Sequence, residues 1–152
     1  MIYTKEELTY LDIMWYGIDR YGKLFVACSG GVGYIPEYII NDRYNNEHTC
    51  YYLLYTLPII GTTKFLRRLK KNCDMRKEYD NLAKHGIWCF DVDFSKPNVY
   101  ELVAKPSCSL IYSDVVHLWG ESDQIQIFDI DIAASKKIEL SSEKIKILNP
   151  NN

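Results

Sequence analysis

The stretch from residue 87 to residue 94 constrains the fold more than any other part of this 152-residue chain. Apolar side chains at 88, 90, 92 and 94 alternate with other residues, a period of two that is typical of a β-strand with one buried face. Turn residues follow at 95–98, and residues 99–104 are again strand-like. The pattern predicts an antiparallel hairpin.

A second hairpin is predicted near the N-terminus, because strand-like runs at 13–18 and 23–28 flank an Asp-Arg-Tyr-Gly turn. Residues 48–57 favour a helix. A longer helix is predicted from 62 or 63 to 84, with a basic stripe of Lys64, Arg67, Arg68 and Lys71 facing solvent.

Further strands are predicted at 125–132 and, more weakly, at 138–148, and a short helix is predicted to begin at Ser113-Asp114. Hairpins on both sides of a helical middle indicate the α+β class. We therefore expect a single domain over 1–152, with a mainly antiparallel sheet built from hairpins and the helical middle segment packed on one face.

Composition excludes several functional classes. With 18 Lys and Arg against 20 Asp and Glu, the net charge of −2 argues against a general nucleic-acid binder. No apolar run has the roughly 18 residues that crossing a membrane requires. The acidic opening MIYTKEELTY lacks the order of a signal peptide. We expect a cytoplasmic protein without membrane or nucleic-acid partners.

Charge is nevertheless segregated along the chain. Residues 64–88 carry 8 basic and 3 acidic side chains, whereas residues 89–131 carry 2 basic and 8 acidic ones. Four of these acids sit opposite apolar residues in predicted strands: Asp91 and Asp93 in one, Asp129 and Asp131 in the other. If the strands are neighbours, these carboxylates share a sheet face, which could be simply solvated, meet a basic partner or bind a divalent cation. We take them as candidate partner-binding residues and expect no metal.

Tyrosine is the other unusual feature, with 13 copies in the chain. Tyr44, Tyr51 and Tyr55 fall with His48 on one face if this stretch is a continuous helix. Tyrosine offers large contact area at low entropic cost and is enriched at interfaces, although a core flank with hydroxyls reaching water is an equally good interpretation. We take the three tyrosines as candidate aromatic anchors for a protein partner.

The five cysteines contain no C-x-x-C pair, which favours reduced and mostly buried thiols. One alternative is catalytic. Cys28 precedes Ser29-Gly30-Gly31 at a strand end, where a thiol could lie beside an oxyanion-binding turn if His85 or His117 served as its base. The chain lacks the Lys-Ser/Thr of a P-loop after these glycines, so a turn with positive φ explains them with fewer assumptions. No cofactor is expected.

Two blocks of the sequence carry a family resemblance. The first block is Trp15-Tyr16-Gly17-Ile18-Asp19, then Tyr21-Gly22, then Ser29-Gly30-Gly31-Val32-Gly33-Tyr34-Ile35-Pro36-Glu37. The second runs from Val99-Tyr100-Glu101-Leu102-Val103-Ala104-Lys105-Pro106 through Ser113-Asp114 to Phe128. In these blocks the chain resembles a family of small bacterial proteins, the immunity proteins of toxin systems.

The chain departs from the family where Val115-Val116 replaces a Leu-Pro, and residues 40–85 match no pattern of the family. The resemblance implies a non-catalytic protein-binding module that neutralises a cognate toxin by occlusion. The alternative is a small enzyme or ligand-binding domain that uses the region of Cys28 and the glycine-rich loop.

Overall fold

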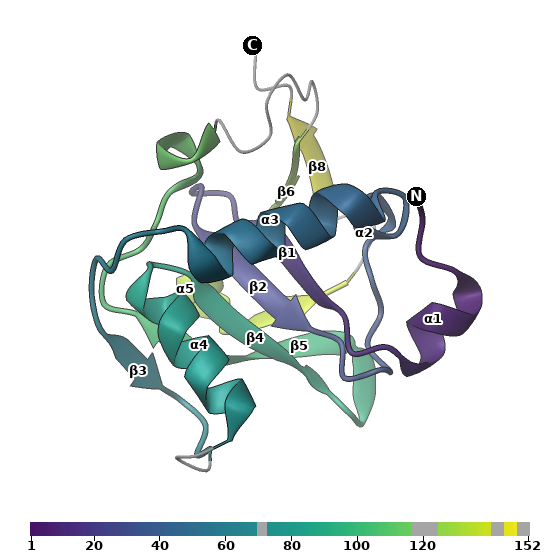
Figure 1. Ribbon diagram of the computed structural model, residues 1–152, viewed down its shortest axis with the longest axis horizontal. Helices are drawn as coiled ribbons and strands as arrows, with labels where there is room; N and C mark the ends of the chain where they lie inside the picture. Colours follow the sequence, from purple (N-terminus) through teal and green to yellow (C-terminus); the bar gives the residue numbers. More distant parts are fainter. Residues whose placement is uncertain (70–72, 117–124, 141–144, 149–152) are drawn as a thin grey trace.

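The computed structural model describes residues 1–69, 73–116, 125–140 and 145–148 (Figure 1). The helices are α1 (Lys5–Tyr10), α2 (Glu37–Ile40), α3 (Arg43–Tyr55), α4 (Asp74–Lys84), α5 (Ile132–Ser135) and the 3-10 turn η1 (Tyr112–Asp114). The strands are β1 (Met14–Ile18), β2 (Leu24–Cys28), β3 (Thr63–Phe65), β4 (Trp88–Asp93), β5 (Lys96–Pro106), β6 (Ile125–Phe128), β7 (Lys137–Glu139) and β8 (Ile145–Leu148).

The main sheet has the order β1-β2-β4-β5-β3, and β7 also pairs with β5. Both predicted hairpins, β1-β2 and β4-β5, are present and antiparallel. Strands β2 and β4 pair in parallel, because the chain crosses over through α2, α3 and α4 between them. The α+β class is therefore confirmed, with a mixed sheet.

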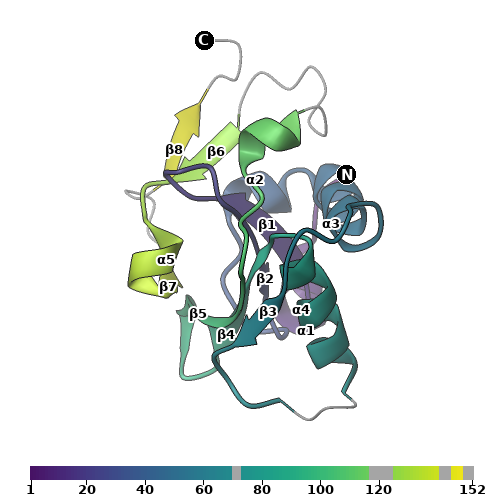
Figure 2. The same ribbon diagram turned by 90° about the vertical axis from the view of Figure 1, so that its left-hand side faces the viewer.

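Helices cover both faces of this sheet unequally. Figure 2 shows α1, α3 and α4 on one side and α5 on the other. Aromatic rings pack on the face away from α3 and α4. The centroid of the Phe25 ring lies 5.8 Å from that of Trp15 and 5.6 Å from that of Phe90, and both pairs are in edge-on contact. Tyr100 and Phe128 complete this cluster against Trp15.

Strand β4 is buried on both faces, contrary to the half-solvated strand that its alternation predicts. Asp91 is only 4% exposed, because α4 packs over this face and Arg67 pairs with its carboxylate. Alternation alone predicts the strand correctly but does not show what covers its polar side.

Two element predictions are wrong. The predicted helix from 62 or 63 to 84 is a strand followed by a helix that begins only at Asp74, since β3 pairs with Ala104–Pro106 of β5 and Cys73 caps α4. The predicted strand 125–132 ends at Phe128, because β6 pairs with β8 in a separate sheet and Asp131 caps α5. The short helix predicted from Ser113-Asp114 to Trp119 lies partly outside the described residues, since 117–124 are not described; in the described part the structure has the 3-10 turn η1.

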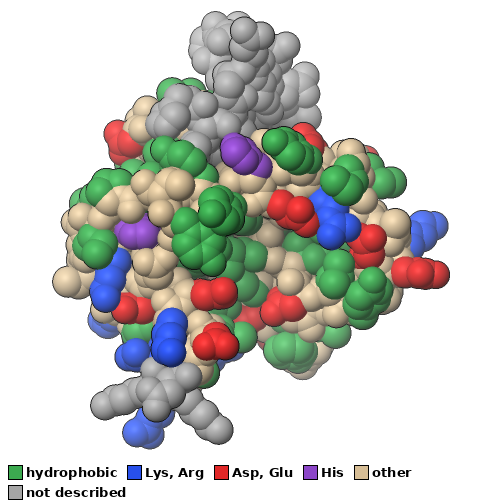
Figure 3. All heavy atoms as spheres, in the orientation of Figure 1, with side chains coloured by type: hydrophobic (Ala, Val, Ile, Leu, Met, Phe, Trp, Pro, Cys, Tyr) green, Lys and Arg blue, Asp and Glu red, His purple; other side chains and the backbone are tan. Residues whose placement is uncertain are grey.

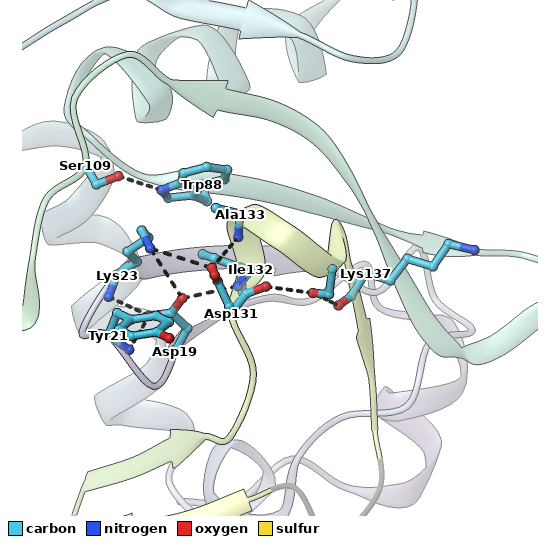
Figure 4. A network of polar contacts seen from close by, with 10 residues as sticks. Asp19, Tyr21, Lys23, Trp88, Ser109, Asp131, Ile132, Ala133 and Lys137 are labelled. Atoms are coloured by element: carbon cyan, nitrogen blue, oxygen red, sulfur yellow. Dashed lines mark hydrogen bonds and ion pairs between the residues drawn. The ribbon is translucent and has the colours of Figure 1, made fainter.

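A buried carboxylate ties the β1-β2 turn to α5 (Figure 4). Asp19 is fully buried and accepts backbone N–H bonds from Tyr21 and Lys23 at 2.9 Å and from Ile132 at 3.2 Å. The Nζ atom of Lys23 lies 4.0 Å from Oδ2 of Asp19 and 3.7 Å from Oδ1 of Asp131. Three donors converging on one carboxylate compensate the cost of burying it.

The helices within the described ranges were also compared with the requirements of a membrane span. None of them is long and apolar enough to cross a bilayer.

Candidate functional site

Helix α3 presents a row of exposed aromatic side chains. Its start is fixed by Asp42, which accepts a hydrogen bond from the N–H of Asn45 at 3.1 Å. Along one face the exposed fractions of Tyr44, Tyr51 and Tyr55 are 67%, 62% and 64%. We call these three residues the tyrosine face.

Neighbouring rings along α3 are in contact with one another. The Tyr44 ring is parallel to that of His48 with centroids 6.0 Å apart, and the Tyr51 and Tyr55 centroids are 4.8 Å apart. The helical spacing predicted this arrangement, and the structure brings the three candidate tyrosines together. Of the two interpretations left open by the sequence, they are not a core flank, because well over half of each side chain is exposed.

The tyrosine face points outward because the opposite side of α3 is fastened to the sheet. Asn46 donates through Nδ2 to the carbonyl of Met14 at 2.9 Å and to the hydroxyl of Tyr3 at 3.2 Å. Thr49, Cys50 and Leu53 are buried on the same side. A rigidly held helix offers its exposed rings at little further entropic cost.

A groove of about 550 Å³ runs beside the tyrosine face. In Figure 3 hydrophobic side chains gather in the hollow between α3 and α4, with acidic side chains around it. The volume lies within the range of pockets that bind small ligands or a partner's side chains. The groove is lined by Tyr3, Leu11, Asp12, Ile13, Met14, Cys28, Arg43, Glu47, Cys50, Tyr51, Leu54, Tyr55 and Glu78.

The charged groups of the groove are mostly acidic. Arg43 is the one cation among the described lining residues, and it already binds Glu7 through Nη1 and donates through Nε to Glu47 at 2.8 Å. These contacts, first of all that with Glu47, raise the pKa of its guanidinium. Asp12 and Glu78 are left as carboxylates without a cation beside them among the described residues.

Cys28 lines the same groove but is only 7% exposed. Burial, and secondarily the carboxylates of Asp12, Asp91 and Glu78, raise the pKa of its thiol to about 12. A nucleophilic cysteine needs the opposite shift, since the thiolate is the reactive form. None of the described lining residues is a histidine; His85 is buried against the carbonyl of Leu53, and His117 lies outside the described residues.

Backbone N–H groups of the glycine-rich loop after β2 donate hydrogen bonds to other groups of the chain. Gly30 and Gly31 adopt φ of +58° and +80°, as the turn interpretation predicted. The N–H of Gly30 donates to Asp12 at 2.8 Å, and that of Gly33 donates to the carbonyl of Ser29 at 2.8 Å. With these donors occupied, the loop is built to hold the start of β1 against the end of β2, not to cradle an anion.

The four candidate aspartates do not share a face. Strand β4 belongs to the main sheet and β6 to the two-stranded sheet, so the strands are not paired neighbours. Asp91 pairs with Arg67, and Asp93 accepts from Ser95 in the β4-β5 turn, which lowers its pKa. Asp129 pairs with Arg20, and Asp131 caps α5 beside Lys23.

Each aspartate is thus placed by a local structural contact, and a joint partner surface or a joint cation site cannot form from all four. Among the residues that the structure describes, no group of three or more His, Cys, Asp or Glu side chains is arranged to hold a metal ion. The partner-binding role of each aspartate on its own stays a prediction.

Sequence reasoning missed the acidic part of the groove. Asp12 comes from the α1-β1 connection, Glu47 from α3 and Glu78 from α4. No sequence signal joins them, because their proximity depends on how three separate segments pack. The chain was also compared with known proteins, and no family model, curated protein or solved structure matched it.

Proposed function

We propose that this chain is a non-catalytic protein-binding module that neutralises a cognate bacterial toxin by occluding it. The observation that carries the proposal is the tyrosine face, three exposed rings held on the outer side of a firmly anchored helix. Exposed aromatic side chains on a rigid scaffold are typical anchors of protein interfaces. The resemblance of the two sequence blocks to immunity proteins suggests that the partner is a toxin.

Occlusion requires no reactive group on this chain. The tyrosine face would cover the toxin's active site, and the adjoining groove would receive a side chain that projects from it. The raised pKa of the Cys28 thiol and the occupied donors of the glycine-rich loop favour this binding role over thiol chemistry.

Co-expression tests the proposal. The toxin candidate is the product of the open reading frame next to the gene, and the readout is growth of cells that express it with and without this chain. We expect wild-type chain to restore growth and the double variant Tyr51→Ala, Tyr55→Ala to lose most of this protection. The matched control is Tyr34→Ala, which removes another ring, 59% exposed, away from α3.

Two outcomes contradict the proposal. One is protection by the double variant equal to that of wild type, with Tyr34→Ala equally neutral. The other is failure of the wild-type chain, folded by circular dichroism, to protect against or bind a neighbouring gene product that is toxic. Because Tyr51 and Tyr55 are exposed on α3 and Tyr34 is exposed in the loop before α2, both variants should keep the wild-type melting temperature within a few degrees.

A further inference from the structure

The groove beside the tyrosine face carries negative charge that the fold does not neutralise. Glu78 has Asp74 and Leu82 one helical turn away at i−4 and i+4, and Met75 and Asn81 at i−3 and i+3. None of these is a cation, although pairs at this spacing are the usual partners of helix carboxylates. Partial burial, followed by the charges of Asp12 and Asp74, raises the pKa of Glu78.

Asp12 contributes a second acceptor. Its Oδ1 is occupied by the N–H of Gly30 at 2.8 Å, and the described residues provide no partner for its other oxygen. Arg43, which is held by Glu7 and Glu47, is not available to neutralise this part of the groove. A ligand that brings positive charge would therefore find acceptors in place, whereas an anion would be repelled.

The remaining walls suit a side chain with a flat cationic head and an apolar stem. Tyr51 and Tyr55 present aromatic rings to the groove, and ring faces attract cations, arginine most often. Leu11, Met14 and Leu54 supply apolar contact for methylene groups. A guanidinium combines bidentate bonding to carboxylates with stacking on aromatic rings, which an ammonium does not.

We propose that the groove between α3, α4 and the α1-β1 connection receives an arginine side chain of the partner protein, bound by Asp12 and Glu78 and covered by Tyr51 and Tyr55. This inference rests on the proposed function, since it assigns the chemistry of the partner at the same site. It places a basic residue on the toxin surface that the tyrosine face would cover.

The test uses a defined probe and needs no identified toxin. The probe is the tripeptide acetyl-Gly-Arg-Gly-amide, titrated into ¹⁵N-labelled protein and followed by amide chemical shifts. Its citrulline counterpart keeps the shape and removes the charge, and its lysine counterpart keeps the charge and removes the planar head. We expect saturable shifts confined to the residues that line the groove, with the arginine peptide binding best.

Removing one carboxylate should weaken this binding. For Glu78→Gln we expect the Kd of the arginine peptide to rise about three- to fivefold, the range of a partly exposed ion pair. The control Glu139→Gln makes the same change at an exposed position on β7, the strand that pairs with β5 away from the groove, and should leave the Kd unchanged (Figure 2). Glu78→Gln removes repulsion and should not lower the melting temperature.

Several results would overturn the proposal: no groove-localised shifts at millimolar arginine peptide, equal binding of the citrulline peptide, or an unchanged Kd for Glu78→Gln. A lysine peptide that binds as tightly as the arginine peptide overturns the assignment of arginine. If the peptide fails to bind while the chain still neutralises the toxin, only this inference falls. If the peptide binds but no toxin is neutralised, the proposed function falls instead.

Discussion

The thiol of Cys28 provides a quantitative test of the distinction between a binding module and a thiol enzyme. Burial raises its pKa from 9.0 to about 12. At pH 8 a thiol with the ordinary pKa is about one-tenth thiolate, whereas one with a pKa near 12 is about one ten-thousandth thiolate. The shift alone should therefore slow modification of Cys28 about a thousandfold relative to an exposed, unshifted thiol.

Cys108 is the internal reference, because it is exposed and free. The assay is modification of the native protein by a thiol-reactive aromatic disulfide at pH 8, with the modified residue identified by mass spectrometry of peptides at successive times. We expect Cys108 to react first and Cys28 to react only at the rate of unfolding. Modification of Cys28 within tenfold of the rate at Cys108 would refute the burial argument and restore the catalytic alternative.

Three further predictions concern stability. Asp19→Ala should lower the free energy of unfolding in urea by about 3 kcal/mol, because one buried and two partly buried N–H groups lose their acceptor; a loss below about 1 kcal/mol would contradict this role. Gly17→Ala should lower the melting temperature, since its Cβ would lie within van der Waals overlap of the Phe25 ring; an unchanged value contradicts the contact. Because the pKa of Cys28 is higher in the folded state than in the unfolded chain, its contribution to stability is complete below about pH 9 and is lost toward pH 12 at about 1.4 kcal/mol per unit. Cys28→Ala should flatten this alkaline loss in denaturation curves, and an equally steep loss would contradict it.

Local signals in the sequence predicted local structure well. Thr4 caps α1 by accepting from Glu7, and Gly22 closes the β1-β2 turn with φ of +82°. The tyrosine face followed from helical spacing alone. Such features depend on residues a few positions apart, so the sequence contains the information that determines them.

Long-range pairing could not be predicted in the same way. Residues Thr63–Phe65 fit a helical pattern, yet they form β3 because β5, some forty residues later in the chain, offers an open edge there. Beyond an apolar run, nothing in the sequence of β2 or β4 indicates that these two strands pair in parallel. The acidic groove could not be predicted from the sequence for the same reason. Asp12 and Glu78 line one groove because α4 packs against the sheet.

Hydrogen–deuterium exchange with and without the neutralised toxin tests the central claim most directly. We predict that binding slows exchange in α3, in residues 11–14 and in the α4 turn that carries Glu78. Exchange should stay the same in α5, on the other side of the sheet, and in β7, which pairs with β5 away from the groove. Protection confined to β7 and α5, or to the loop with Asp129 and Asp131, would contradict the assignment of the tyrosine face and its groove as the partner site.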